Sequence, residues 1–240
     1  GGRAGVGEGS KGHREIEYRG TRDGDEKGQP DPVETDHHKA PKNKNSVRAF
    51  VAIALEADAR SALTRASALL QREPWAEGVR WVPAGNLHLT LRFLGEIAEA
   101  TVPELMDALG ARLRNVEPFG CALDGVSLFP TRARPRAISA GLTEVHQLEE
   151  LALVVEEAVV SAGHAPETRG FRAHITLGRL RRRAERKIEL AVELEQTAVS
   201  VREVVLYRST LDPGGARYSV LGRTALGTRG GSRSNPGPSN

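Results

Sequence analysis

Two short segments of the sequence combine a histidine and a threonine in the same order. The first is Leu-His-Leu-Thr-Leu at 87–91, and the second is Ala-His-Ile-Thr-Leu at 173–177. At this composition a His-apolar-Thr-apolar match is expected by chance about 0.06 times, and two matches roughly 0.002 times. The repeated segments are therefore a functional signal. Their polar members are His88, Thr90, His174 and Thr176.

Two histidines and two hydroxyl groups suit the hydrolysis of a phosphoester. An imidazole titrates near neutral pH, so one histidine can donate a proton while the other accepts one. With a 2′,3′-cyclic phosphate, the base activates a water for in-line attack and the acid protonates the departing ribose oxygen. The threonines donate hydrogen bonds to the non-bridging oxygens, where charge builds up. This chemistry needs no metal, and we expect no cofactor.

Two other interpretations of the histidines compete with catalysis. A single histidine on a strand is more often structural than catalytic, but the duplication favours a catalytic pair. Metal binding is a weak alternative because neither segment has a Cys, Asp or Glu at ligand spacing. The other histidines are expected in solvated or surface positions, and they are His13, His37, His38, His146 and His164.

Alternation along a strand predicts how the segments present these groups. Alternate side chains point to opposite faces, so His88 and Thr90 share one face, and His174 and Thr176 share another. The apolar neighbours are expected to pack against helices. If the domain consists of two similar halves packed face to face, the four polar groups converge on one cleft.

The remaining pattern predicts an α+β domain with mostly antiparallel strands. Extended segments are expected at 47–55, 79–83, 87–94, 119–128, 136–142, 171–180, 201–210 and 216–226. Helices are expected at 56–73, 98–116 and 143–163. Thr101 is a plausible cap, Pro103 fits the first turn of its helix, and Gly163 closes the last helix.

Composition divides the 240 residues into three parts. Residues 1–45 contain few large apolar side chains and are expected to form a disordered N-terminal tail. Residues 46–227 form one globular domain, and 228–240 return to Gly, Ser and Pro as a disordered C-terminal tail. We expect a monomer, although the sequence carries no direct signal of oligomeric state.

Charge and cysteine content limit the class of protein. No apolar stretch is long enough to span a bilayer and no secretory signal is evident, so we expect a cytoplasmic protein. The single Cys121 fits a reducing compartment. Of 34 basic residues, 28 are Arg, which agrees with a phosphate or RNA ligand but equally with a genome rich in G and C.

Five ordered segments resemble the two-histidine (2H) phosphoesterase superfamily, and specifically the RNA 2′,3′-cyclic phosphodiesterases, also called 2′-5′ RNA ligases. They are RAFVAIAL at 48–55, NLHLTLRFLGE at 86–96, LFPTRARPRAISAGL at 128–142, FRAHITLGR at 171–179 and VVLYRSTLDPGGARYSVL at 204–221. The resemblance implies a bilobal α+β fold with two pseudo-symmetric lobes, each an antiparallel sheet flanked by helices. It also implies an RNA or oligonucleotide substrate.

The resemblance also implies roles for individual residues. His88 is the proton donor to the 3′ oxygen and His174 the proton acceptor from water, which leaves a 2′-phosphomonoester. Thr90, Thr176 and Arg179 contact the substrate. Because Arg179 has the opposite strand parity to His174, it needs a bend at Gly178 to reach the cleft.

The chain departs from the family pattern at two positions. Ala173 replaces the proline that usually precedes the second histidine, which removes a fixed backbone dihedral. Ser139 stands where many relatives carry tryptophan, which removes an aromatic platform for a base. Phe50, Phe93, Phe171 and Tyr207 are the remaining stacking candidates, and most of them are expected in the core.

Two alternative functions remain open at this point. One is 2′-5′ RNA ligation by the reverse reaction, which needs a second strand with a 5′-hydroxyl group. The other is an RNA-binding module without catalysis that uses the arginines. The two complete His-Thr segments argue against simple binding, because binding alone does not require paired histidines.

Overall fold

The computed structural model describes residues 45–181, 188–212 and 215–227. The expected terminal tails therefore lie outside the described residues, apart from residue 45. The strands are β1 (Ser46–Ala54), β2 (Val79–Trp81), β3 (His88–Ala98), β4 (Phe119–Phe129), β5 (Ala137–Leu142), β6 (Ile175–Leu180), β7 (Ala198–Val201), β8 (Glu203–Asp212) and β9 (Gly215–Ala225). The helices are α1 (Ala57–Leu70), α2 (Val102–Leu113) and α3 (Val145–Ser161), with short 3₁₀ turns η1 (Pro74–Gly78), η2 (Ala84–Asn86) and η3 (Glu99–Thr101).

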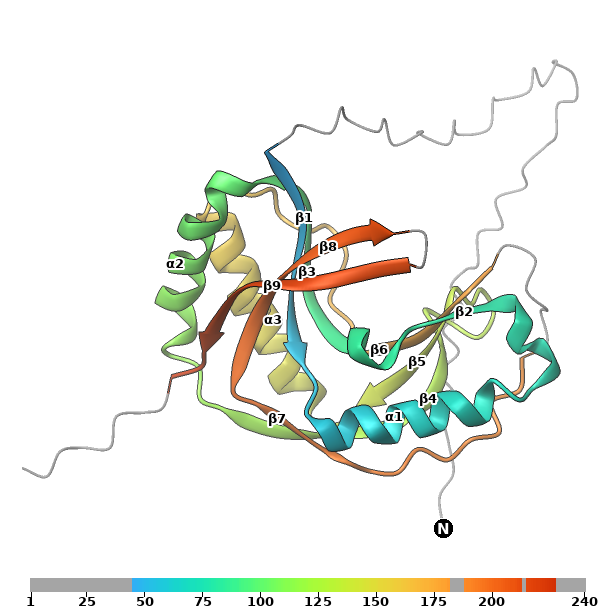
Figure 1. The fold of residues 1–240 in the computed structure, drawn as a ribbon. Coiled ribbons are helices and arrows are strands. Elements are labelled where there is room, and N and C mark those ends of the chain that lie inside the picture. The colour runs from blue at the N-terminus through green and yellow to red at the C-terminus, as the bar shows by residue number, and fades with distance from the viewer. Residues whose placement is uncertain (1–44, 182–187, 213–214, 228–240) are drawn as a thin grey trace, which may run out of the picture. The chain divides into compact units, whose positions relative to one another are not determined.

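The strands form one curled antiparallel sheet in the order β7-β4-β5-β6-β3-β1-β8-β9, with β2 paired to β6 (Figure 1). We call β3, β1, β8 and β9 the first half of the sheet, and β2, β6, β5, β4 and β7 the second half. The expected α+β fold with two similar halves is confirmed, but the expected face-to-face packing of the halves is wrong. The halves are joined edge to edge through β3 and β6, and the chain crosses between them several times, so neither half is a continuous piece of sequence.

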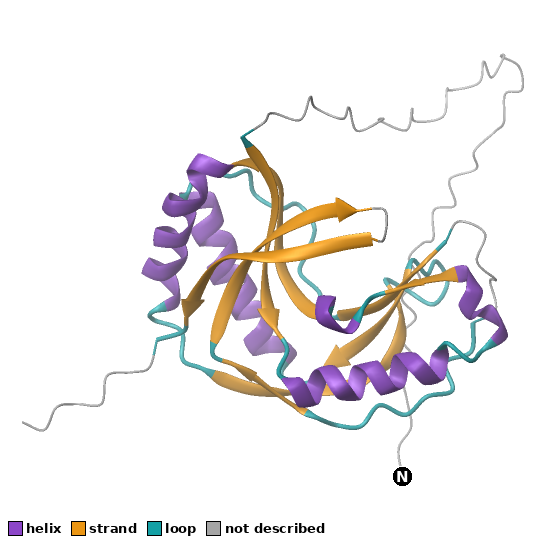
Figure 2. Cartoon of the chain, viewed as in Figure 1, coloured by secondary structure: helices purple, strands orange, loops and turns teal. Residues whose placement is uncertain are grey.

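Helices cover the outer side of the curled strands (Figure 2). Helices α2 and α3 pack on each other and contact β9 and β3 of the first half, while α1 contacts β7 of the second half. Each helix has the apolar stripe that such packing requires. In α1 the buried stripe consists of Ala59, Ala62, Leu63, Ala66 and Leu70, and in α2 of Leu105, Leu109 and Leu113.

Two of the three expected helix-end features are present. Pro103 lies in the first turn of α2, and Gly163 follows α3 with φ of 85°, where its N–H reaches Val160 O at 3.0 Å. Thr101 occupies the N-cap position of α2 as expected, but its hydroxyl donates to Ala98 O at 2.8 Å and does not bond a backbone N–H of the helix. The preceding turn η3 places Thr101 in a helical conformation, which excludes the usual cap geometry.

The terminal strand pair forms as expected, with β8 antiparallel to β9 from Glu203↔Ala225 to Asp212↔Gly215. Strand β7 was not expected, because the sequence pattern indicates an extended segment only from residue 201. It pairs with β4 and completes the outer edge of the second half. Among the described residues, no helix is both long and apolar enough to cross a membrane.

Candidate active site

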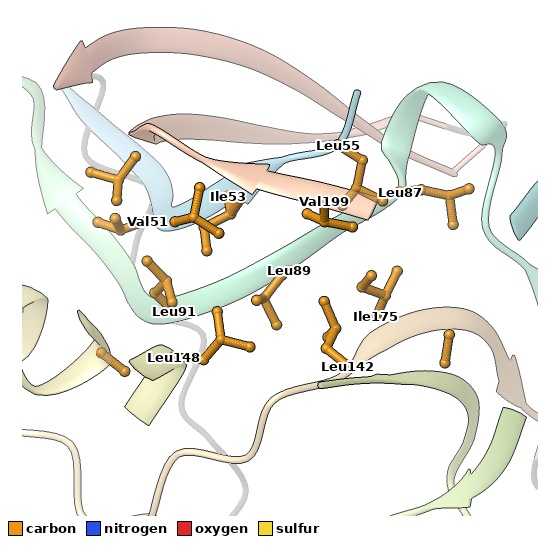
Figure 3. Packing of buried hydrophobic residues seen from close by; sticks show 14 of the residues in the cluster. Val51, Ile53, Leu55, Leu87, Leu89, Leu91, Leu142, Leu148, Ile175 and Val199 are labelled. Atoms are coloured by element: carbon orange, nitrogen blue, oxygen red, sulfur yellow. The ribbon is translucent and has the colours of Figure 1, made fainter. Parts of the chain in front are cut away.

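The two His-Thr segments meet at the middle of the sheet. Leu89 of β3 is the register partner of Ile175 of β6, and both side chains are almost completely buried. Figure 3 shows these two residues within one apolar cluster that joins the halves. Continuing this antiparallel register by one residue each way places His88 toward Thr176 and Thr90 toward His174. The four polar groups are thus related by an approximate two-fold axis near the Leu89–Ile175 pair.

The alternation expected from the sequence is present in both strands. Leu89 and Leu91 are buried on one face of β3, while His88 and Thr90 are partly exposed on the other. In the second segment, Ile175 and Leu177 are buried and the polar residues are partly exposed. We call the side of the sheet that carries the four polar groups the histidine face.

Each of these strands has a β-bulge directly after its threonine. In β3, Thr90 and Arg92 pair with consecutive residues of β1, which leaves Leu91 as the extra residue. In β6, Thr176 and Gly178 pair with consecutive residues of β5, which leaves Leu177 as the extra residue. A bulge reverses the alternation beyond it. The fifth residue after each histidine therefore returns to the histidine face, and these residues are Phe93 and Arg179.

The bulge in β6 explains how Arg179 reaches the histidines despite its strand parity. A bend is present as predicted, but it lies one residue before Gly178, at the extra residue Leu177. The Arg179 guanidinium is close enough to both imidazoles to contribute to the lowering of the pKa of His88 and of His174. No carboxylate among the described residues pairs with Arg179, so its positive charge remains available.

Hydrogen bonds fix the imidazole of His88. Its Nδ1 lies 2.7 Å from Asn86 O, and its Nε2 lies 2.9 Å from Thr90 Oγ1. A carbonyl oxygen only accepts, so Nδ1 carries a proton. In the neutral imidazole Nε2 is then the acceptor, and the Thr90 hydroxyl donates to it.

His174 is held in the same way. Its Nδ1 lies 2.7 Å from Arg172 O, again the carbonyl two residues earlier in the chain, so Nδ1 is the donor. The ring of Phe129 stacks on this imidazole, with centroids 3.8 Å apart. The Arg172 guanidinium lies 4.8 Å from the centroid of the Phe129 ring and donates to Pro130 O at 3.0 Å. In both histidines a backbone carbonyl thus fixes Nδ1 and leaves Nε2 as the ring nitrogen without a backbone partner.

Burial disfavours the charged form of both imidazoles. Desolvation is the largest cause of the lowered pKa of His88, and it is opposed by the hydrogen bond to Asn86 and reinforced by the charges of Arg179 and His174. The pKa of His174 is lowered mainly by desolvation, with further contributions from the charges of Arg179 and Arg172. At neutral pH both Nε2 atoms are therefore acceptors, ready to receive a proton.

A family model for LigT-like phosphoesterases matches residues 53–139 and 142–218. The first match contains His88 and Thr90, and the second contains His174 and Thr176. The two matches together cover more than half of the chain. The chain belongs to the LigT-like phosphoesterase family.

Two individual relatives support this family membership. A Thermus thermophilus protein named RNA 2′,3′-cyclic phosphodiesterase is 35% identical over 203 residues, which cover 80% of this chain and 96% of the relative. A protein of the same name from Methanothermobacter thermautotrophicus is 31% identical over 180 residues, 73% of this chain and 96% of its own. The chain is thus an enzyme of the family, matched over nearly the full length of these relatives.

Solved structures of LigT-like phosphoesterases also match the fold. A crystal structure titled phosphoesterase has a TM-score of 0.62 at 32% identity and covers 76% of this chain and 99% of its own. Escherichia coli LigT complexed with 3′-AMP has a TM-score of 0.61 at 32% identity, with 75% and 98% covered. The curled sheet with paired His-Thr strands is therefore the family fold.

Aromatic rings surround His88 in the first half of the sheet. The Phe50 ring centroid lies 4.8 Å from that of His88, and the Tyr218 ring meets His88 edge-on at 5.3 Å. Tyr207 stacks on Phe50 at 5.3 Å. The expectation that most of the stacking candidates lie in the core is only partly right, because Phe50 is buried whereas Phe93 is 48% exposed. The first half thus offers an aromatic wall beside His88.

The two departures from the family pattern are explained differently by the fold. Ser139 is only 1% exposed and is the register partner of Thr176, so this small residue lies in the floor of the histidine face and offers no surface for stacking. Ala173 is partly buried against the core. The hydrogen bond from His174 to Arg172 O forms without a proline at this position.

The other described histidines lie away from the site. His146 is highly exposed and its Nε2 lies 3.2 Å from Glu150 Oε1, as expected for a surface residue. His164 is half-buried at a polar pocket beyond the end of α3, so its expected surface position is only partly right. His13, His37 and His38 lie outside the described residues. Among the residues described, no three His, Cys, Asp or Glu side chains are grouped as a metal site requires.

Sequence reasoning missed four residues that shape this family's site here. Asn86 and Arg172 each precede a histidine by two residues and accept from its Nδ1 through their backbone carbonyls, a contact that the residue type does not signal. Asn86 also donates through Nδ2 to Ala216 O at 2.6 Å, which ties the turn before His88 to β9. Phe129 and Tyr218 contact His174 and His88 because the sheet is curled, and no local sequence pattern predicts these contacts.

Proposed function

We propose that this enzyme hydrolyses the 2′,3′-cyclic phosphate ends of RNA to 2′-phosphomonoesters, with two histidines and no metal. The observation that carries the proposal is the matched arrangement of His88 and His174. Each has its Nδ1 proton fixed on the carbonyl two residues before it, and each has a threonine two residues later on the same face of the sheet. Nε2 of His88 lies 2.9 Å from Thr90 Oγ1. The names of the relatives, RNA 2′,3′-cyclic phosphodiesterase, agree with this substrate.

In the proposed reaction, Nε2 of His174 takes a proton from a water molecule, and the water oxygen attacks phosphorus. The bond from phosphorus to the 3′ oxygen breaks, and Nε2–H of His88 protonates that oxygen as it leaves. The 2′ oxygen keeps the phosphate. His88 must enter the reaction protonated, and the negative phosphate favours this form once it is bound.

The remaining groups stabilise charge on the phosphate. The hydroxyls of Thr90 and Thr176 donate hydrogen bonds to the non-bridging oxygens. When His88 is protonated, its Nε2 no longer accepts from Thr90, so this hydroxyl is free to turn toward the phosphate. Arg179 supplies a positive charge near both imidazoles and binds the phosphate before attack.

The proposal is tested with a short RNA that ends in a 2′,3′-cyclic phosphate, incubated with the protein in excess EDTA. The wild type is expected to give a 2′-phosphate. The variants His88→Ala and His174→Ala are each expected to lose a factor of about 10² to 10⁴ in rate. His146→Ala is the matched control, because His146 is highly exposed and contacts only Glu150 in the described structure.

Three results would contradict parts of this proposal. Survival of the cyclic end with folded wild-type protein would exclude the substrate. Full activity of either alanine variant would exclude the two-histidine mechanism. A 3′-phosphate product would show that the 2′ oxygen leaves, and the roles of the two histidines would then have to be reassigned.

A further inference from the structure

Arginines of the second half differ from those elsewhere in the domain. On the first half and the helices, many arginines lie beside a carboxylate, such as Arg92 with Glu156, Arg112 with Glu157 and Arg208 with Glu99. Around β6 and the 130–136 segment, the described arginines have no carboxylate partner among the described residues. This group consists of Arg80, Arg132, Arg134, Arg136, Arg172, Arg179 and Arg181.

The 130–136 segment connects the two sides of the site within the second half. It starts directly after Phe129, which stacks on His174, and it ends directly before Ala137, the register partner of Arg179. Arg136 O accepts a hydrogen bond from Leu180 N at 2.9 Å, and Pro130 O accepts one from Arg172. The segment is therefore fastened to the strand of the second histidine at both of its ends.

Three arginines alternate along this segment. Arg132, Arg134 and Arg136 are exposed, and none of them forms an ion pair with a carboxylate among the described residues, although Glu189 lines the same pocket as Arg132. Arg80 is a fourth exposed arginine. It lies beside Arg179, because the two residues are register partners on the neighbouring strands β2 and β6. Uncompensated arginines close together repel one another, and an anion that binds there relieves this repulsion.

One terminal phosphate does not need so many cations. The cyclic phosphate already has two histidines, two threonines and Arg179. The alternating arginines extend beyond these groups, as suits a chain of phosphates spaced along a strand. The first half offers rings instead, because Phe50, Tyr207 and Tyr218 gather around His88.

We infer that Arg132, Arg134 and Arg136 bind the phosphodiester backbone of the RNA strand on the 5′ side of the cyclic end. The enzyme then selects the ends of oligonucleotides over cyclic mononucleotides, which have no such backbone. This inference rests on the proposed function, because it assumes that the cyclic phosphate binds between His88 and His174.

The test compares two substrates and two triple variants. The substrates are 2′,3′-cyclic AMP and a ten-nucleotide RNA that ends in a 2′,3′-cyclic phosphate. One variant is R132Q/R134Q/R136Q. The matched control is R48Q/R72Q/R202Q, which removes three exposed arginines that also lack a carboxylate partner among the described residues but lie outside the segment.

The segment variant is expected to lose at least tenfold in kcat/KM on the ten-nucleotide RNA and less than twofold on 2′,3′-cyclic AMP. The control variant is expected to stay within twofold on both. Loss of three contacts to RNA phosphates is also expected to make the dependence of log affinity on log salt less steep, by about 2 in the magnitude of the slope for a single strand. Equal loss on both substrates, or no loss on the RNA, would overturn the inference.

Failure of the proposed function is distinguishable from failure of this inference. If the wild type hydrolyses neither substrate, binding of the same RNA is measured by fluorescence anisotropy in the H88A/H174A background. The segment variant is then expected to raise Kd at least tenfold relative to the control variant. An unchanged Kd would overturn the inference whatever the catalytic result.

Discussion

The ring of Phe129 lies against the imidazole of His174, with centroids 3.8 Å apart and planes inclined by 15°. The hydrogen bond from Nδ1 to Arg172 O fixes one edge of the imidazole, and the stacked ring restricts its rotation about that bond. We therefore expect Phe129 to act as a positioning residue, through its contact with His174.

Phe129→Leu is expected to lower kcat by about tenfold with little change in KM, since an aromatic pair contributes roughly 1 kcal/mol. Phe129→Tyr keeps the stacked ring and should retain most of the activity. Steady-state kinetics on the cyclic RNA measure both effects, and NMR titration of His174 reports its environment. A purely structural role would predict that kcat follows thermal stability in both variants, and that result would contradict the positioning role.

The pH dependence of kcat/KM reports the free enzyme, in which the pKa of His88 and of His174 lies below 6.5. The proposed mechanism needs His174 neutral and His88 protonated. As pH rises above both pKa values, His88 loses its proton, so kcat/KM is expected to peak below pH 6.5 and to decline above it. The profile of kcat should peak at higher pH, because bound phosphate favours the charged imidazole. A kcat/KM maximum at pH 7.5 would contradict this assignment.

Arg179→Gln provides the control for the same measurement. The Arg179 charge lowers the pKa of both histidines, so its removal raises both values and should move the kcat/KM maximum to higher pH. The rate itself should also fall, because a phosphate contact is lost. A lower rate with an unmoved maximum would mean that Arg179 acts on the substrate without influencing the imidazoles.

The sequence predicted the residues of the candidate site better than it predicted the pairing of the strands. His88, Thr90, His174 and Thr176 follow from a duplicated local pattern, and alternation along a strand placed them on the correct face. For Arg179 the resemblance required a bend near Gly178, but the sequence could not show that this bend is a bulge at Leu177, because a bulge depends on the register of the neighbouring strand β5. The sequence also could not show that the halves share one sheet, since the pairing of Leu89 with Ile175 joins residues far apart in the chain.

Arg92 lies in the same strand as His88, but its contacts stabilise packing and do not reach the histidines. Its side chain is only 10% exposed and contacts Glu156, Glu167 and the carbonyl of Ala165. Arg92→Met leaves the partly buried Glu156 without its cation, whereas Glu167 keeps Arg169 at 3.1 Å. The substitution is expected to reduce the free energy of unfolding by about 3 kcal/mol. Arg112→Met breaks the exposed pair with Glu157 and should cost less than about 1 kcal/mol.

Urea denaturation of the two variants tests this difference. If both variants lost the same free energy of unfolding, burial would not make the ion pairs of Arg92 more stabilising than the exposed pair of Arg112. Because Arg92 points away from the histidine face, the folded Arg92→Met protein is expected to keep the pH profile of the wild type.

Gly178 occupies the one position of β6 where a side chain would strike the neighbouring strand. A Cβ there would lie 2.5 Å from Val79 Cγ1 and 3.2 Å from Trp81 Cε3. Gly178→Ala therefore forces β2 away from β6 and is expected to cost about 1–3 kcal/mol of stability. Because Gly178 follows the bulge and precedes Arg179, the same shift moves this guanidinium, and kcat/KM should fall together with stability.

The matched control for this prediction is Gly110→Ala in α2, where a Cβ meets no atom within 4 Å. Alanine favours a helix over glycine, so this variant should gain up to about 1 kcal/mol and keep full activity. Thermal denaturation and kinetics on the cyclic RNA measure both variants. A Gly178→Ala protein with wild-type stability and rate would show that β2 yields without cost, and that the close packing of Val79 and Trp81 on β6 does not hold Arg179 in place.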